Sequence, residues 1–292
     1  MTCPDALPFE CTLPSTYKDG ERFRPLPPSF NYCSPGVPGL CAKCTYTFSI
    51  HITKNRFWKR RINLAVPLNY YPHTRPHRPI LSNHLSFMST IKPAPEEWHQ
   101  VTCTMTTRPN TGFHPIGCHL FIPSAQIYAI TDIIPFHVQL CAPLSSLGAL
   151  MISPPSTDRR HSLNSCSPAT KTPFIRVFLL RQIMVSVFGQ RAWRTCVIGE
   201  GNLRPLPPLS HDVNSQSEDL QTVDWDGEVR CDEGVQAGGF NVGNLTVKDF
   251  IVLALYPPSP TTSPLSELQH AHPIRLVTDP WVDLPGLHEE RL

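Results

Sequence analysis

The sequence predicts an all-β protein built from antiparallel sandwiches, and three observations lead to that prediction. Several short segments alternate between apolar and polar residues, as strands with one buried face do. The chain holds 33 prolines in 292 residues, and a proline inside a helix removes a backbone donor and interrupts it. No helical segments alternate with the strand-like ones, which disfavours a parallel α/β sheet.

The strand-like segments are bounded by turn residues and differ in the strength of their pattern. The segment CTYTFSIHIT (44–53) alternates most clearly, RINLAVPLNY (61–70) is its expected return strand, and the basic KNRFWKRR between them is the expected hairpin loop. FIRVFLLRQIMVSVFGQ (174–190) is rich in β-branched and aromatic residues, which favours a long strand over a helix. The remaining predicted strands lie in 101–108, in 119–140 on both sides of Thr131–Asp132, in 243–258 and in 272–279.

Three stretches lack order signals and are expected to be loops or linkers. Residues 72–98 are proline-rich and typical of a domain junction. Residues 152–173 and 205–222 are rich in serine, proline and charge, as flexible surface loops are.

Composition limits the classes of function. The formal net charge is +2, so nothing draws the whole chain toward nucleic acid. The first residues do not resemble a signal peptide, and no apolar run approaches the length of a spanning helix. We therefore expect a cytoplasmic protein whose 11 cysteines are free and mostly buried thiols.

Motifs that would indicate catalysis are weak or absent. Cys41 and Cys44 form a lone C-x-x-C without a second ligand pair, so we interpret them as structural thiols entering a strand. Gly199 and Gly201 lack the third glycine of a dinucleotide fingerprint and are interpreted as a strand turn. Neither a G-x-S-x-G nor a P-loop occurs. We therefore expect no catalytic residues, no bound metal and no cofactor.

The segment LQHAHPIRLV (268–277) leaves one alternative open. His270 and His272 would project to the same side of an extended chain, a plausible start for a metal site or a catalytic base. The favoured interpretation puts both histidines on the loop side of a terminal strand that Pro273 begins.

Basic residues cluster with aromatic ones in the predicted hairpin loop. Arg56, Lys59, Arg60 and Arg61 lie around Phe57–Trp58. Such a cluster can bind phosphate or acidic groups, or make weak contact with an anionic membrane. The alternative is a solvated hairpin tip.

The motif RPLPP occurs twice, at 24–28 and 204–208. Polyproline with an adjacent arginine is a preformed ligand for the aromatic grooves of SH3-type domains. The second copy is the better candidate because it falls in a predicted loop. Its residues are Arg204, Pro205, Leu206, Pro207 and Pro208.

The order of the predicted strands resembles a known family. LPFECTLPSTYKDGERFRPLPPSF (7–30) followed by GLCAKCTYTFSIHIT (39–53) resembles the later half of the arrestin N-terminal lobe, where a PF…LP…LPPSF segment leads into a strand. IGCHLFIPSAQIYAITDIIPFHVQL (116–140) resembles the opening of the C-terminal lobe, 174–193 its central strand and 245–279 its terminal pair. In strand order and anchor residues, the sequence most resembles divergent fungal, α-arrestin-related proteins.

This resemblance implies two immunoglobulin-like antiparallel β-sandwich lobes, of which the first is incomplete. It implies a partial N-terminal-like lobe over 1–75, a proline-rich junction over 76–98 and a C-terminal-like sandwich over 99–292. The first lobe would lack its opening strands, because the matching segment begins almost at Met1.

The function that the resemblance implies is that of a non-enzymatic adaptor in endocytosis and protein transport. Such an adaptor binds cytosolic tails of membrane proteins or trafficking proteins, in the cytoplasm or peripherally at membranes. The Pro-Pro-x-Tyr motifs by which α-arrestins recruit HECT-type ligases are absent, so direct ligase recruitment is not expected. Two alternatives stay open: a metal-dependent all-β enzyme that uses histidines such as His270 and His272, and a non-functional truncated fragment.

Overall fold

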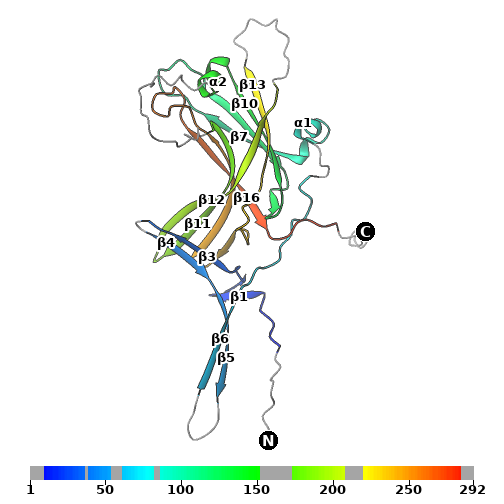
Figure 1. The fold of residues 1–292 in the computed structure, drawn as a ribbon, viewed down its shortest axis with the longest axis vertical. Coiled ribbons are helices and arrows are strands. Elements are labelled where there is room, and N and C mark those ends of the chain that lie inside the picture. Colours follow the sequence, from blue (N-terminus) through cyan, green and yellow to red (C-terminus); the bar gives the residue numbers. More distant parts are fainter. Residues whose placement is uncertain are drawn as a thin grey trace, which may run out of the picture. The chain divides into compact units, whose positions relative to one another are not determined.

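The chain is mainly β-strand, as the sequence predicts (Figure 1). The computed structural model describes residues 10–36, 39–53, 61–81, 86–151, 173–207 and 220–283. Within these ranges the helices are short, and neither α1 (Phe87–Thr90) nor α2 (Leu144–Met151) is long and apolar enough to cross a membrane.

The chain divides into two compact units. Unit 1 comprises Met1–Pro72, Met184–Arg194 and Phe240–Thr246, and unit 2 comprises His73–Ile183, Thr195–Gly239 and Val247–Leu292. Unit 1 therefore combines the N-terminal segment with two segments from later in the chain. No sequence pattern predicted that these segments belong together.

The strands of unit 1 are short and pair mostly with their sequence neighbours. They are β1 (Thr16–Asp19), β2 (Arg22–Pro25), β3 (Phe30–Ser34), β4 (Leu40–Cys44), β5 (Tyr46–Thr53), β6 (Arg61–Leu68) and β14 (Phe240–Val242).

The elements of unit 2 are longer and more apolar. Besides α1 and α2 they are η1 (Pro95–Glu97), β7 (Trp98–Met105), β8 (Ile116–Pro123), β9 (Ile127–Ala129), β10 (Ile134–Ala142), β13 (Gln221–Val229) and β16 (Leu268–Val277). Three long strands contribute residues to both units: β11 (Ile175–Val187), β12 (Gln190–Pro205) and β15 (Leu245–Leu255).

One large sheet contains the strands of unit 2. Its order is β7-β8-β10-β13-β12-β11-β15-β16-β9, with β14 beside β15. The pairs are antiparallel where their register is known, except that β16 and β9 run parallel. Within unit 2 the sheet curls until β7 approaches β16, where the rings of His99 and His272 have centroids 4.9 Å apart.

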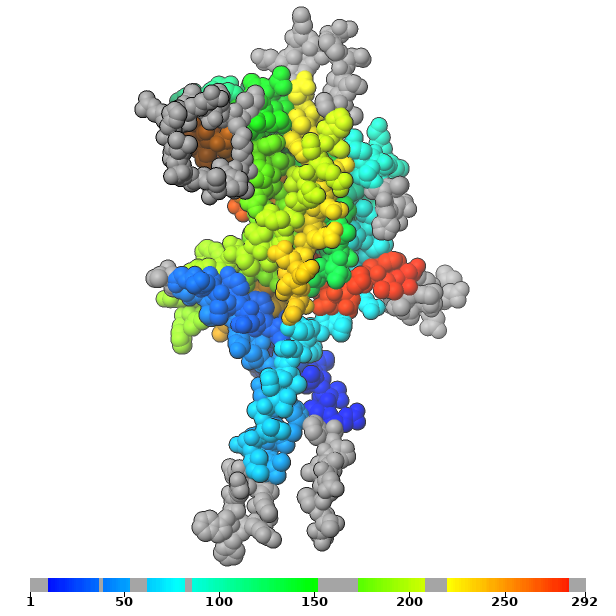
Figure 2. All heavy atoms as spheres, viewed as in Figure 1, coloured from blue at the N-terminus to red at the C-terminus, as the bar shows by residue number. Residues whose placement is uncertain are grey.

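The curled sheet of unit 2 encloses an apolar core. In β10, Phe136, Val138 and Leu140 point inward and are at most 2% exposed, as period-two alternation requires. In Figure 2 the strands β12 and β13 (yellow-green and yellow) lie beside each other on one face of this unit, in agreement with their antiparallel pairing. The largest fully buried side chains are Tyr128, Phe136, Met105, Ile116, Leu120, Ile122, Ile134, Leu140, Leu147, Leu150, Leu179 and Ile183.

Glycines occur in β12 and β13 because other groups occupy the space of their side chains. A Cβ at Gly201 would meet the ring of Phe136 at 3.2 Å, and one at Gly227 would overlap the same ring. A Cβ at Gly199 would overlap the carbonyl of Arg230. The interpretation of Gly199 and Gly201 as a strand turn was therefore wrong: both lie inside β12, at points of close backbone approach.

A buried ion pair connects β11 and β15. Arg181 and Asp249 are 7% and 2% exposed. Arg181 donates from Nε to Asp249 Oδ1 (2.7 Å) and from Nη2 to Asp249 Oδ2 (3.1 Å), and Nη2 also reaches the carbonyl of Ala237 (2.8 Å). The bidentate geometry and the third hydrogen bond satisfy both charges inside the fold.

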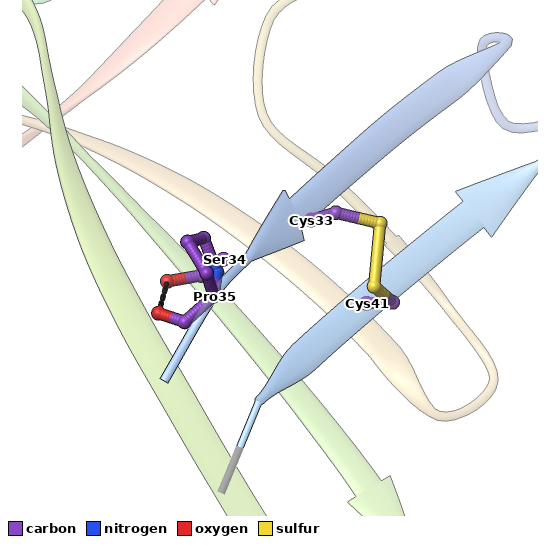
Figure 3. The surroundings of a disulfide bond; sticks show 4 residues. All are labelled: Cys33, Ser34, Pro35 and Cys41. Atoms are coloured by element: carbon purple, nitrogen blue, oxygen red, sulfur yellow. Dashed lines mark hydrogen bonds between the residues drawn. A yellow bond between two sulfur atoms is a disulfide. The ribbon is translucent and has the colours of Figure 1, made fainter. Parts of the chain in front are cut away.

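A disulfide connects two strands of unit 1 (Figure 3). Cys33 and Cys41 are partners in the β3–β4 register and are bonded through sulfur. The expectation of free thiols was therefore wrong for these two exposed residues, since their pairing depends on a register that the sequence does not display. Cys44, the other half of C-x-x-C, is free and half-buried in β4.

The structure confirms some of the other predictions and corrects others. The hairpin 44–70 and the long strand within 174–190 are confirmed as β5–β6 and β11. His270 and His272 lie inside β16, not on its loop side, and α2 and β13 were not predicted.

Candidate functional site

The hairpin β5–β6 has one apolar face. Cross-strand register places Phe48 opposite Val66, Ile50 opposite Leu64, and Ile52 opposite Ile62, so these six side chains form one ladder. The exposed fractions are 52% for Ile52, 53% for Ile62, 53% for Leu64 and 41% for Val66. Four exposed apolar side chains in one row, next to the half-buried Phe48 and Ile50, indicate an interaction surface.

The opposite face of the hairpin is more polar, although Ala65 and Pro67 of β6 also lie on it. It carries Thr47, Ser49 and His51, and His51 Nδ1 lies 2.8 Å from Asn63 Oδ1. The hairpin is therefore amphipathic, which in a two-stranded sheet is the pattern of a strand pair that packs on something else.

Both edges of the hairpin are open in the described part of the chain. β5 and β6 form a two-stranded sheet by themselves. Their outer backbone N–H and C=O groups are therefore available to a further strand.

The base of the hairpin is anchored in unit 1. The Tyr46 hydroxyl donates to the carbonyl of Pro27 (2.6 Å), and the Tyr46 and Tyr70 rings meet edge to face. Ser29 and Tyr70 exchange two further hydrogen bonds. Burial, together with the nearby Cys44, raises the pKa of Tyr46 to about 12, so this hydroxyl remains a donor at neutral pH.

The predicted basic contacts are mostly outside the described residues. Arg56, Lys59 and Arg60 fall in 54–60, outside the described residues, and Arg61 is the first residue of β6. The chain connectivity alone places this basic stretch between the ends of β5 and β6.

The predicted SH3-ligand segment begins in a strand. Arg204 and Pro205 are the last residues of β12, opposite Asp226 and Trp225 of β13, and the Leu206 N–H donates to the carbonyl of Asp224 (2.9 Å). The premise that all of this segment is loop was therefore wrong. Pro207 follows the strand and Pro208 lies outside the described residues, and SH3 recognition stays a prediction.

A pocket of about 470 Å³ opens in unit 2. Arg108 is held there by hydrogen bonds from Nη1 to the carbonyl of Thr261 (3.0 Å) and from Nη2 to that of Pro260. The lining of the pocket combines this guanidinium and several hydroxyls with apolar side chains. The lining residues are Arg108, Thr111, Phe113, Ala149, Pro258, Ser259, Thr262, Ser263 and Pro264.

His270 and His272 share one face of β16, and His272 contacts a third histidine. The ring of His272 lies against that of His99, and its Nε2 is 3.0 Å from Gln126 Oε1. Burial lowers the pKa of His272, and His99 and His270 lower it further. In the ranges that the structure describes, no group of three or more His, Cys, Asp or Glu has an arrangement that could hold a metal ion.

A buried histidine between two carboxylates was missed by the sequence reasoning. His137 is fully buried, with Nδ1 2.6 Å from Asp226 Oδ1 and Nε2 3.0 Å from Asp224 Oδ1. The ring stacks on Phe87 at 4.0 Å between centroids. Because the side chain has no exposed surface, this arrangement joins β10 to β13 and gives a substrate no access. The Asp-x-Asp alternation of β13 was the available signal.

No family model matches the sequence, and the search of curated proteins found no match.

Proposed function

We propose that this protein is a non-enzymatic, arrestin-like adaptor that binds extended acidic tails of membrane or trafficking proteins along hairpin β5–β6. In this proposal the chain forms two immunoglobulin-like lobes, and the hairpin belongs to the first. The observation that carries the proposal is the exposed apolar ladder of β5–β6 beside open strand edges.

The mechanism is strand addition. An extended tail pairs its backbone with β5 or β6, and alternate side chains of the tail pack on the apolar ladder. Lys54, Arg56, Lys59, Arg60 and Arg61 at one end of the hairpin favour a tail that carries carboxylates or phosphates. Backbone pairing supplies affinity, and the basic end selects the charge of the partner.

The proposed location is the cytoplasm, at the inner surface of membranes where such tails occur. Exposed disulfides are readily reduced there, so the Cys33–Cys41 bond is expected to be open in cells. Alkylation of cell extracts under acid quench, followed by mass spectrometry, measures this directly. A fully oxidised pair would contradict a cytoplasmic location.

The binding experiment uses a fluorescein-labelled peptide of alternating valine and glutamate, with its valine–lysine counterpart as the control ligand. Fluorescence anisotropy should report binding of the acidic peptide only. Reversing Arg56, Lys59, Arg60 and Arg61 to glutamate should weaken binding more than about tenfold, because like charges across an interface cost several kcal/mol.

Two matched variants separate the apolar ladder from the polar face. Ile62→Ser combined with Leu64→Ser should abolish binding, whereas Thr47→Ser combined with Ser49→Thr on the opposite face should leave it unchanged. Phosphatidylcholine vesicles with and without phosphatidylserine test the other anionic partner. Binding to phosphatidylserine vesicles without binding to the peptide, or binding to neither, would overturn the proposal.

A further inference from the structure

Two cysteines face each other in unit 2. Cys103 of β7 and Cys118 of β8 are partners in the antiparallel register, so their side chains lie on the same face of the sheet. That face is the inner one, because Cys118 belongs to the buried core and Cys103 packs against it. Cys103 is only half-buried, on the strand that ends the sheet order, and is the more accessible of the two.

The two thiols have different acidities. The neighbouring Cys118 thiol lowers the pKa of the Cys103 thiol, against the effect of burial. The Cys103 thiol and burial raise the pKa of Cys118, whose thiol donates to the carbonyl oxygen of Ile116 at 3.4 Å. Burial raises the pKa of the other half-buried thiols, such as Cys196 and Cys231.

The chain itself holds a precedent for the oxidised form of this geometry. Cys33 and Cys41 have the same relation, directly opposite on neighbouring antiparallel strands, and they form a disulfide. The neighbouring thiol of Cys141 cannot compete for Cys118. In the β8–β10 register Leu140 is opposite Cys118, so the next residue, Cys141, lies on the other face of the sheet.

We propose that Cys103 and Cys118 form a peroxide-sensitive dithiol in which Cys103 is oxidised first and Cys118 closes a cross-strand disulfide. The Cys103 thiolate attacks one oxygen of hydrogen peroxide, the O–O bond breaks, and hydroxide leaves to take up a proton. Cys118 sulfur then attacks the sulfenic acid of Cys103, and the departing hydroxide takes the Cys118 proton as water. Two thiols lose two electrons, and one peroxide becomes two waters.

The difference in accessibility assigns these roles, because Cys103 is half-buried whereas Cys118 has no exposed surface, and the acidities agree with it. The thiolate is the attacking form, and it is favoured at Cys103. Cys118 holds its proton until the sulfenic acid is adjacent to it. The product cross-links β7 to β8 without a change of register, because the two residues are already partners.

The experiment treats the purified full chain with hydrogen peroxide, blocks free thiols by alkylation and identifies disulfides by mass spectrometry. A Cys103–Cys118 disulfide should form at least about tenfold faster than oxidation of Cys196, whose thiol is less ionised. Oxidation of Cys196 or Cys231 before Cys103, or the absence of a Cys103–Cys118 bond, would overturn the proposal.

Variants separate the two steps. Cys118→Ser should trap a sulfenic acid at Cys103 that reacts with dimedone, and Cys103→Ser should remove both the adduct and the disulfide. Cys141→Ser, a neighbour on the opposite face, should leave disulfide formation unchanged. The wild-type peptide map decides the question by itself if a variant fails to fold, since it needs no substitution.

Discussion

The two units differ in how completely they bury their apolar side chains. In unit 2, strand β10 keeps Val138 and Leu140 fully buried. In unit 1 the buried aliphatic side chains that the structure describes, Leu40, Ala42 and Leu245, keep 5–9% of their surface exposed, and Phe23 is 74% exposed. A curled many-stranded sheet can enclose its own inner face, but a two-stranded ribbon cannot. Unit 2 is therefore expected to supply most of the stability, whereas unit 1 leaves apolar surface exposed, which the proposed partner would cover.

The largest difference in stability is expected between a buried ion pair of unit 2 and an exposed ion pair of unit 1. Asp249→Ala would leave Arg181 charged and buried in unit 2 and should cost about 3–5 kcal/mol of unfolding free energy. Asp19 and Arg24 of unit 1 are 2.8 Å apart but one third exposed, so Asp19→Ala should cost less than about 1 kcal/mol. Urea denaturation of both variants measures the difference, and equal costs would contradict the contrast.

A pair of leucines sharpens the same comparison. Leu140 has no exposed surface, and Leu64 is 53% exposed on the hairpin. Leu140→Ala should lower the free energy of unfolding by about 2–5 kcal/mol through a cavity. Leu64→Ala should change it by no more than about 0.5 kcal/mol. A large loss at Leu64 in the free protein would mean that the ladder is already covered.

The smallest expected effect is on the pH dependence of stability, through His272. The fold lowers the pKa of His272 through burial, His99 and His270, so the unfolded chain binds this proton more readily. Stability should therefore fall as pH drops below the unfolded value of about 6.5. His272→Gln should reduce that slope. Thermal melts across this pH range give the slopes, and an unchanged slope in His272→Gln would contradict the assignment.

Local patterns predicted the elements whose own residues decide their structure. The alternation in 44–53 and 61–70, with a basic stretch between, is sufficient for β5–β6, and β-branched residues are sufficient for β11. The strand β13 has the sequence QTVDWDGEV, which is polar and follows a serine-rich stretch. It becomes a strand because β10 and β12 pair with it on both sides, and no window of sequence contains that information.

The same limit applies to the candidate sites. The apolar ladder could be predicted from period-two alternation once the hairpin was assigned. Both cysteine pairs and the His137 network depend on cross-strand register, since Cys118 and Cys103 become neighbours only when β7 and β8 align. The need for glycine at position 227 could not be predicted either, because the ring of Phe136, on another strand, occupies the space that a side chain would take.

Amide hydrogen exchange, followed with and without the valine–glutamate peptide, tests the central claim most directly. In the free protein the amides of β5 and β6 should exchange rapidly while those of β10 stay protected, because only β10 is paired on both sides and buried. Saturating peptide should slow exchange in β5 or β6 and leave β10 unchanged. A hairpin as protected as β10 in the free protein, or one that the peptide does not protect, would contradict the account.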